Sequence, residues 1–569
     1  MKKRTMHISI SSLMISVLVG LTACGNQNAP DLSANSNENA EVETATVEET
    51  LSDSSVEEKK EDAAEIRYDY EQELNIIDDN YRNYYEIFVY SFYDSDGDGI
   101  GDINGVTQKL DYIQDMGFNG IWLMPIMQST TYHKYDVTDY YAIDKEYGTI
   151  EDFQLLLDEC HKRDINVVID FVINHSSSQH PWFQEACTYL RQLPDGQEPD
   201  IEECPYVDYY HFADEKVNSD YYSVNGSDWY YEGVFWSEMP DLNLESDALR
   251  TEIEDIARFW LDMGVDGFRM DAVMHFEEND TAFNTEVLNW LYEFCKGINP
   301  DFYMVSEVWA NKATIADYYA SGTPSMFNFD VADTEGKLIK AARGNYKAAN
   351  FVESMMGYQT DYSDKNPDYI DAPFIANHDM GRVANGVMKD ANDMKMACGL
   401  LMTMHGSPFV YYGEEIGMSS SGKKDENKRL PMIWSDTDTT GMTVGPKDAD
   451  QDISSAFAGV EEQLQDPYSI LNYYKRAIRL RNENPELARG QIEIVEELTD
   501  GNQAAIIKTY DDSRIAIVYN TSDEPLSIVL TGTELAGLSI RGYLTINGEI
   551  MELDGETLAM PAQSICILK

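Results

Sequence analysis

Short apolar runs alternate with helical patterns from Tyr85 onward. The runs are rich in β-branched and aromatic residues, and they cover residues 87–90, 120–125, 166–172, 267–270, 302–307, 326–329, 374–378 and 407–413. One of the helical patterns between them places apolar residues three and four apart, at Ile253, Ile256, Phe259, Trp260 and Met263. Eight strands that alternate with helices predict an α/β fold, a (β/α)8 TIM barrel, and continuous apolar strands are typical of a parallel sheet buried on both faces.

Two regions depart from this alternation. About seventy aromatic and polar residues separate the third run from the helical pattern that begins near Ser246, and a structureless loop of that length is uncommon inside a compact domain. We therefore expect an inserted B domain at residues 176–245, which divides the barrel into residues 76–175 and 246–488. After about Arg489, short strands separated by turns predict a C-terminal β-sandwich domain at residues 489–569.

The N-terminal residues have the features of a secretion signal. Lys2, Lys3 and Arg4 precede an apolar segment at residues 8–21, which is too short to span a membrane and is typical of a signal-peptide core. The segment ends in LTACG, which resembles a bacterial lipobox and implies lipidation of Cys24; an ordinary cleaved signal with an incidental cysteine is the alternative. We expect a lipoprotein signal peptide at residues 1–23, a disordered acidic tether at 24–75, and anchoring to the extracellular face of a bacterial cell membrane.

Composition narrows the classes of partner. The 569 residues carry a formal net charge of −61, which argues against nucleic-acid binding, because phosphate neutralisation needs clustered Lys and Arg. An acidic, soluble chain suits an uncharged substrate or cations, and we expect it to act as a monomer. Apart from Cys24 there are six cysteines, and none forms a CxxC pair that would indicate zinc. A bridge between Cys187 and Cys204 is left open.

The stretch DSDGDGIGD at residues 94–102 places aspartates at 94, 96, 98 and 102, with glycines among them. It begins like an EF-hand calcium loop, but the twelfth residue is Gly105 where that loop needs a glutamate, and a strand-like run precedes it. The residues expected to surround one divalent cation, four through carboxylates and one through its backbone carbonyl, are Asp94, Asp96, Asp98, Asp102 and Ile100. A solvated acidic turn is the alternative.

Polar residues fall where the predicted barrel strands end. They are Asp170, Asn174 and His175 after the third strand, Arg269 and Asp271 after the fourth, Glu307 after the fifth, and Asn377, His378 and Asp379 after the seventh. In barrels of this kind the chemistry lies at the C-terminal ends of the strands. Several carboxylates that converge there with an arginine and two histidines exceed what helix capping requires.

The motifs around these residues resemble glycoside hydrolase family 13, the α-amylase family. They are DFVINH (170–175), GFRMDAVMH (267–275), EVW (307–309) and FIANHD (374–379), supported by HKYDVTDYYAID (133–144), MPDLN (239–243), GSPFVYYGEEIGM (406–418) and the C-terminal MPAQSICIL. The resemblance covers about residues 80–569 and implies a barrel, an inserted B domain and a C-terminal sandwich.

The resemblance also implies roles. Asp271 would be the nucleophile, Glu307 the general acid and then the base, and Asp379 would bind sugar hydroxyls and favour the oxocarbenium-like state. Residues that hold the site or the sugar would be Arg269, His175, His378, Tyr135 and Asp170. In several branches of the family the Asp-rich loop binds a structural calcium ion. A second calcium site, with an asparagine like Asn174 and a carbonyl like that of His275, is left open.

The sequence also bears on which of the family's activities the chain has, because the activities differ between branches of the family. MPDLN resembles the branch intermediate between oligo-1,6-glucosidases and neopullulanases, and α-1,6-specific relatives tend to carry Val where this chain has Ala272. Both features favour an α-amylase that cleaves α-1,4-glucans such as starch. Met274 stands where many α-amylases have Lys, so product size is open. An exo-α-glucosidase, a neopullulanase, a glucosyltransferase and a non-catalytic starch-binding surface protein are the alternatives.

Overall fold

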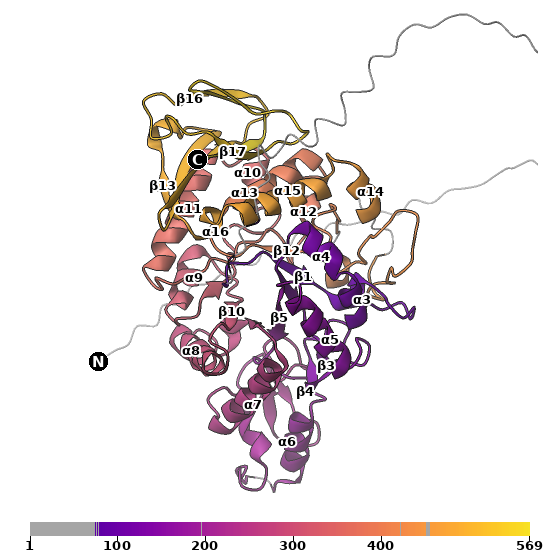
Figure 1. Cartoon of the computed structure of the whole chain (residues 1–569). Coiled ribbons are helices and arrows are strands. Elements are labelled where there is room, and N and C mark those ends of the chain that lie inside the picture. The colour runs from indigo at the N-terminus through magenta and orange to yellow at the C-terminus, as the bar shows by residue number, and fades with distance from the viewer. Residues whose placement is uncertain (1–73, 75–76, 78, 195, 421–422, 451–455) are drawn as a thin grey trace, which may run out of the picture. The chain divides into compact units, whose positions relative to one another are not determined.

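The computed structural model describes residues 74, 77, 79–194, 196–420, 423–450 and 456–569 (Figure 1). The predicted signal peptide, Cys24 and all of the tether except Leu74 lie outside these residues. Within the described part, none of the helices combines the length and apolarity that a membrane crossing requires.

A curled parallel sheet forms the centre of the molecule. Its strand order is β11-β10-β9-β5-β2-β1-β12. The strands are β1 (Tyr84–Ile87), β2 (Gly120–Leu123), β5 (Asn166–Phe171), β9 (Gly267–Met270), β10 (Tyr303–Ser306), β11 (Ser325–Met326) and β12 (Phe409–Tyr411). The gap between β11 and β12 is bridged by residues 372–374, through the parallel pairs Phe327–Ala372 and Phe374–Phe409. The predicted (β/α)8 barrel is therefore confirmed, and its strands are buried almost throughout.

Helices follow the strands. They are α2 (Val89–Phe92), α3 (Ile103–Gln108), α4 (Leu110–Met116), α5 (Ile150–His161), α7 (Asp247–Met263), α8 (Thr281–Ile298), α9 (Lys312–Tyr319), α10 (Lys337–Ala342), α11 (Ala348–Ser363), α12 (Val383–Gly386), α13 (Ala391–Thr403), α14 (Val460–Gln465), α15 (Ile470–Glu483), α16 (Glu486–Arg489) and the 3-10 turns η2 (Val273–His275), η3 (Asp425–Lys428) and η4 (Glu496–Leu498). Helix α7 shows why the local sequence folds this way. The Ser246 hydroxyl caps its first turn by accepting from the Leu249 amide, and Gly264 ends it at φ 108°.

Two strand predictions are displaced. The first strand lies at 84–87 instead of 87–90, and Val89 to Phe92 form a helical turn. The buried acid Glu86 interrupts the apolar pattern of the true strand, so the apolar run after it was assigned instead. The predicted strand at 374–378 is also wrong in its bounds, because only Ala372 and Phe374 pair with neighbours.

Residues 176–245 contain a separate small sheet. Its strands β6 (Phe212–Ala213), β8 (Tyr230–Glu232) and β7 (Tyr221–Ser223) are antiparallel, and they accompany α6 (Pro181–Gln192) and η1 (Pro205–Asp208). The bridge His175–Asp241 joins this region to the end of the third barrel strand. A hairpin of β3 (Met127–Ser129) and β4 (Val137–Ile143) lies outside the parallel sheet. Cys187 and Cys204 are both buried free thiols, so the disulfide left open by the sequence is not formed.

Two antiparallel sheets make up the C-terminal region. One has the order β13-β14-β15-β20-β17 and the other β16-β19-β18. Their strands are β13 (Gln491–Ile494), β14 (Gln503–Tyr510), β15 (Ser513–Asn520), β20 (Ser564–Leu568), β17 (Ile540–Leu544), β16 (Leu526–Val529), β19 (Thr557–Met560) and β18 (Glu552–Asp554). Side chains of both sheets, such as Val518, Cys566, Ile528 and Leu558, share one buried cluster. This is the C-terminal β domain that the short strands predicted.

Candidate active site

The fold brings all eight predicted catalytic and substrate-binding residues together: seven lie in or shortly after barrel strands, and Tyr135 lies between β3 and β4. Five of them line one cavity of about 520 Å³: Tyr135, His175, Asp271, Glu307 and Asp379. The other three, Asp170, Arg269 and His378, lie behind its wall and are at most 1% exposed. The predicted set therefore divides into groups that face the cavity and groups that hold them.

Arg269 is the hub of the site. Its Nη1 donates to Asp170 Oδ1 at 2.7 Å and to Asp271 Oδ1 at 2.5 Å, and its Nη2 pairs with Glu307 Oε2 at 3.0 Å. Three carboxylates thus share one buried guanidinium, which can stay charged at any pH of interest. A buried carboxylate pair without such a cation would be strongly unfavourable, so Arg269 permits Asp271 and Glu307 to lie side by side.

Glu307 sits in an environment that favours its protonated form. Burial raises the pKa of its carboxyl, and the neighbouring Asp271 raises it further, although Arg269 acts in the opposite direction. The backbone amide of Ala272, which has a left-handed φ of 48°, donates to Glu307 Oε2 at 3.0 Å. A carboxyl group whose pKa is raised in this way can act as a general acid near neutral pH.

Asp379 has the opposite electrostatic setting. Burial alone would raise the pKa of its carboxyl, but His378 and Arg429 outweigh burial and hold it well below the ordinary value. Arg429 Nη2 lies 2.6 Å from Asp379 Oδ1, and His378 Nε2 lies 3.1 Å from Asp379 Oδ2. The carboxylate is therefore ionised and fixed at the cavity wall.

His175 offers a free ring nitrogen to the cavity. Its Nδ1 lies 3.0 Å from Asn174 Oδ1, whereas its buried Nε2 has no protein partner. Burial lowers the pKa of His175 to about 4, so the ring is neutral. An unpartnered buried nitrogen at a cavity wall is suited to a ligand hydroxyl.

One side of the cavity is apolar. Phe235 and Trp309 line it and are 47% and 51% exposed, and Met274 also lines it. Trp309 stacks on Phe329 with ring centroids 5.0 Å apart. Exposed aromatic faces next to carboxylates match the mixed apolar and polar faces of a sugar ring.

Sequence reasoning did not single out several residues of the site. Besides His133, Phe235 and Asp425 in the cavity wall, they include Glu86 and Arg429. Glu86, on β1, accepts from His378 Nδ1 at 2.7 Å, and Arg429, just after η3, binds Asp379. The sequence pattern did not indicate Glu86, because an acid in a barrel strand interrupts the apolar pattern. Arg429 lies in an irregular segment, and nothing in its local sequence connects it to Asp379, which is fifty residues away.

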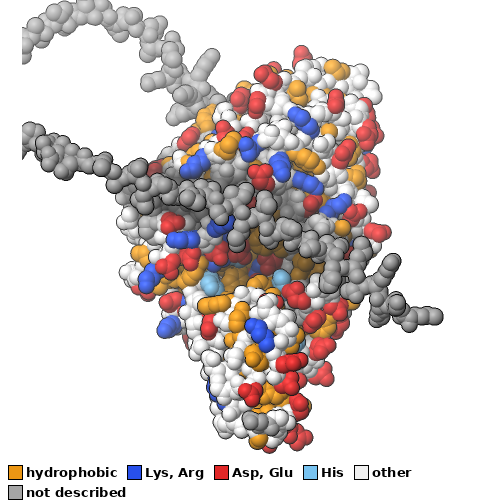
Figure 2. Space-filling model, turned by 180° about the vertical axis from the view of Figure 1, so that it is seen from behind, with side chains coloured by type: hydrophobic (Ala, Val, Ile, Leu, Met, Phe, Trp, Pro, Cys, Tyr) orange, Lys and Arg blue, Asp and Glu red, His pale blue; other side chains and the backbone are white. Residues whose placement is uncertain are grey.

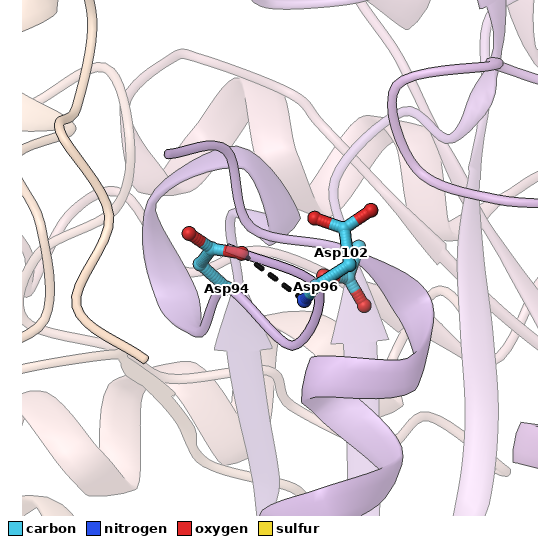
Figure 3. A group of neighbouring side chains, drawn as sticks. All are labelled: Asp94, Asp96 and Asp102. Atoms are coloured by element: carbon cyan, nitrogen blue, oxygen red, sulfur yellow. Dashed lines mark hydrogen bonds between the residues drawn. The ribbon is translucent and has the colours of Figure 1, made fainter. Parts of the chain in front are cut away.

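The Asp-rich loop brings three of its four aspartates together. Ligand oxygens of Asp94, Asp96 and Asp102 all lie within 4.8 Å of one another (Figure 3). Oxygens bound to one calcium ion at 2.3–2.6 Å are at most about 5 Å apart, so these three fit a cation. Asp98 is not in the group, and its carboxylate accepts from the Ile100 amide at 2.8 Å.

Glycines shape this loop. Asp94 accepts from the amides of Gly97 at 2.6 Å and Gly99 at 2.8 Å, and both glycines have a positive φ near 90°. Asp102 also caps α3 by accepting from the Gly105 amide at 2.8 Å. At the second place considered for calcium, the Asn174 amide donates directly to the His275 carbonyl at 2.5 Å.

Comparison with known proteins identifies the family. The family model "Alpha amylase, catalytic domain" matches residues 86–490. The chain belongs to the α-amylase family, glycoside hydrolase family 13. As a member of this family, it is a glycoside hydrolase that acts on α-glucans.

Relatives in this α-amylase family differ in activity. The chain is 37% identical to "Alpha-amylase 3" of Dictyoglomus thermophilum, over 83% of this chain and 88% of that protein. It is 28% identical to "Glucan 1,6-alpha-glucosidase" of Streptococcus pneumoniae, over 85% of this chain and 97% of that protein. The solved structure "Eubacterium rectale Amy13B" has 44% identity and a TM-score of 0.84, and the match covers 87% of this chain and 97% of that one.

The surface agrees with an uncharged substrate. On the face in Figure 2, basic side chains are scattered among more numerous acidic ones and form no continuous patch. A polyanion would need such a patch.

Proposed function

We propose that the chain is a retaining α-amylase that hydrolyses α-1,4 bonds of starch and maltooligosaccharides outside the cell. One observation carries the proposal: Arg269 binds both Asp271 and Glu307, which line one cavity, and the pKa of Glu307 is raised. Retaining glycosidases need this pair, one carboxylate as nucleophile and one carboxylic acid as proton donor.

In the first step, Asp271 Oδ attacks the anomeric carbon and the glycosidic C–O bond breaks. Glu307 gives its proton to the departing oxygen, which leaves as the free hydroxyl of the second sugar. In the second step the Glu307 carboxylate takes a proton from water, and the resulting hydroxide oxygen bonds to the anomeric carbon as the Asp271 ester breaks. Both carboxyl groups return to their starting states, and two substitutions at one carbon restore the α configuration.

The remaining residues hold the sugar and the charges. Asp379, ionised between His378 and Arg429, would bind hydroxyls and stabilise the positive charge that develops on the ring. His175 would bond a hydroxyl through its free Nε2, and Tyr135 would stack on the sugar from the cavity wall. Asp170 and Arg269 keep the pair in place from behind.

We also propose a structural calcium ion in the loop at residues 94–102, held by Asp94, Asp96 and Asp102 with the Ile100 carbonyl and Asp98 as further candidates. The grouping of three ligand oxygens within 4.8 Å supports it. The lipobox-like LTACG supports anchoring of the enzyme through Cys24 at the cell surface.

A second candidate is an exo-acting glucosidase or glucosyltransferase with the same chemistry. The similarity to a protein named as a glucan 1,6-alpha-glucosidase supports this candidate, whereas Ala272 and MPDLN favour α-1,4 cleavage. A non-catalytic starch-binding protein is disfavoured, because Asp271, Glu307 and Asp379 are all in place at the cavity.

The deciding experiment is proton NMR of maltoheptaose during hydrolysis by the purified chain. Immediate appearance of α-anomeric maltose and maltotriose is the expected result, since it shows retention and internal α-1,4 cleavage. Glucose as the sole product would move the enzyme to the exo-glucosidases, and longer oligosaccharides would indicate transfer. Binding without turnover would revive the non-catalytic alternative.

A further inference from the structure

Glu86 is a carboxylate buried inside the barrel, where no direct role in cleavage is open to it. It lies on β1 in register with Trp122 on one side and Tyr411 on the other, and it is 1% exposed. Burial of a carboxylate is costly unless it is paired. Its partner is His378, whose ring Nδ1 lies 2.7 Å and whose backbone amide lies 3.3 Å from the same oxygen, Glu86 Oε1.

The hydrogen bonds around His378 determine how many protons the ring carries. The His378 backbone amide donates to Glu86 Oε1, and ring Nδ1 lies against the same oxygen. Burial raises the pKa of Glu86, whereas the contacts with His378 lower it, and an ionised Glu86 requires that Nδ1 be the donor. On the other side of the ring, Nε2 lies 2.7 Å from the Tyr135 hydroxyl oxygen and 3.1 Å from Asp379 Oδ2. The Tyr135 proton goes to Asp170 Oδ2, 3.1 Å away.

A protonated Nε2 fits this arrangement. The Tyr135 oxygen and the Asp379 carboxylate both face Nε2 as acceptors, and a bare nitrogen lone pair would repel the carboxylate. With both ring nitrogens protonated, every group in the chain Glu86–His378–Tyr135–Asp170 has a partner of the right kind. The ring is also completely buried, so no solvent can make up a missing bond.

We propose that Glu86 is a positioning residue that holds His378 as a doubly protonated imidazolium, which in turn orients Asp379 at the cavity and keeps it ionised. The role of Asp379 in this inference rests on the proposed function, whereas the charge state of His378 does not. An amide in place of Glu86 would fill the same space and accept the same hydrogen bond, so what the carboxylate adds is its charge.

The charges that face His378 come from several elements. They are Glu86 on β1, Asp170 on β5, Arg269 on β9, Asp379 next in sequence, Tyr135 before β4, and Arg429, whose Nε donates to the His378 carbonyl. Burial lowers the pKa of His378, but the contacts with Asp379 and Glu86 outweigh burial and raise it to about 9. Removing one of the two carboxylates should therefore bring the pKa of His378 down.

The test compares the wild-type chain with Glu86→Gln by NMR of the full chain labelled with ¹³C and ¹⁵N at histidine. His378→Gln serves to assign the resonance. The matched control is Glu414→Gln, because Glu414 is also buried but accepts from Tyr474 and does not contact His378. We expect a wild-type ring protonated at both nitrogens at pH 7, and a pKa about one unit or more lower in Glu86→Gln but unchanged in Glu414→Gln.

Activity provides the second readout. Since a lower pKa means that His378 loses its proton at lower pH, the rate of Glu86→Gln relative to wild type should fall as pH rises. For a shift of one unit from a pKa of about 9, the fall is about twofold at pH 8 and about tenfold well above pH 9. The ratio should stay flat for Glu414→Gln, and in a His378→Gln background Glu86→Gln should add no further pH dependence. Any glycoside that the wild type cleaves serves as substrate.

A neutral His378 ring at pH 7 in the wild type would overturn the inference, even if Glu86→Gln failed to fold. An unchanged His378 pKa in a folded Glu86→Gln variant would also overturn it. Failure of the proposed α-amylase activity is recognised separately, because the NMR titration needs no substrate.

Discussion

The different roles of Asp271 and Glu307 can be distinguished by comparing substrates with different leaving groups. Asp271→Asn removes the nucleophile, so turnover should fall by several orders of magnitude with every substrate. Glu307→Gln removes the proton donor of the first step and the base of the second. In kcat/KM, which reports the first step, it should cost about 10²–10⁴-fold with starch but much less with an α-glycosyl fluoride, whose leaving group needs no proton. With the fluoride, the alkaline limb of kcat/KM that belongs to Glu307 should disappear. Equal losses on both substrates in the two variants would contradict the assigned roles.

Arg429 is a residue of the site that no sequence motif indicated, and its role can be tested by mutation. Arg429→Lys keeps the positive charge but cannot reach Asp379, the His378 carbonyl and the Tyr132 hydroxyl at once, as the guanidinium does. We expect kcat to fall at least about tenfold, because Asp379 is no longer held in one orientation. Thermal melting of the variant is the control for folding. Wild-type kcat in a folded Arg429→Lys chain would show that His378 alone suffices.

At the scale of elements, strand beginnings could be predicted better than strand ends: the starts at residues 120, 166 and 267 are exact, whereas the runs 120–125 and 166–172 extend past the ends of β2 and β5. Residues 267–270 were assigned correctly: the strand lies between Asp266 and Asp271, although it contains Arg269. The first strand was placed three residues late because Glu86, which serves the site, looks like a loop residue. Asp271 and Glu307 could be predicted because they follow directly on β9 and β10, whereas Glu86 and Arg429 could not, since their partners come from distant parts of the chain.

The Asp-rich loop is an element whose stability should depend on an ion. Without a cation, Asp94, Asp96 and Asp102 repel one another at close range, and a ligand at about 100 times its Kd adds about 2.7 kcal/mol to the folded state. We expect EDTA to lower the Tm measured by calorimetry, and added calcium to restore it. Asp96→Asn should lose most of this response while keeping activity at low temperature. A melting curve that EDTA does not change would contradict the calcium site and favour a solvated acidic turn without a cation.

For the molecule as a whole, Cys24 should decide where the activity is found. Each buried methylene of an acyl chain contributes about 0.8 kcal/mol, so a diacylated N-terminus partitions firmly into a bilayer. In a bacterial host that processes lipoproteins, we expect wild-type activity in the membrane fraction and Cys24→Ser activity in the soluble fraction. An acidic tether of this length spans roughly 40 Å, which would leave the cavity accessible to polymers. Wild-type activity in the soluble fraction would contradict the anchor.

The raised pKa values of the buried Glu414 and of His378 should both make the stability of the fold depend on pH. Burial raises the pKa of Glu414 to about 8, and the pKa of His378 is raised to about 9. Above pH 6.5 these two groups therefore keep protons that the unfolded chain releases, so they make the free energy of unfolding fall as pH rises to about 9; the buried Lys508, whose pKa is lowered, acts in the opposite direction. Below pH 6.5 the effect is offset by buried neutral histidines such as His175, whose pKa is lowered. The net charge of −61 adds repulsion in the same direction.

At constant calcium, the Tm should be several degrees lower at pH 9 than at pH 6.5, and Glu414→Gln should flatten this slope. A Tm that stays constant or rises over that range would mean that Glu414 and His378 titrate near their ordinary values.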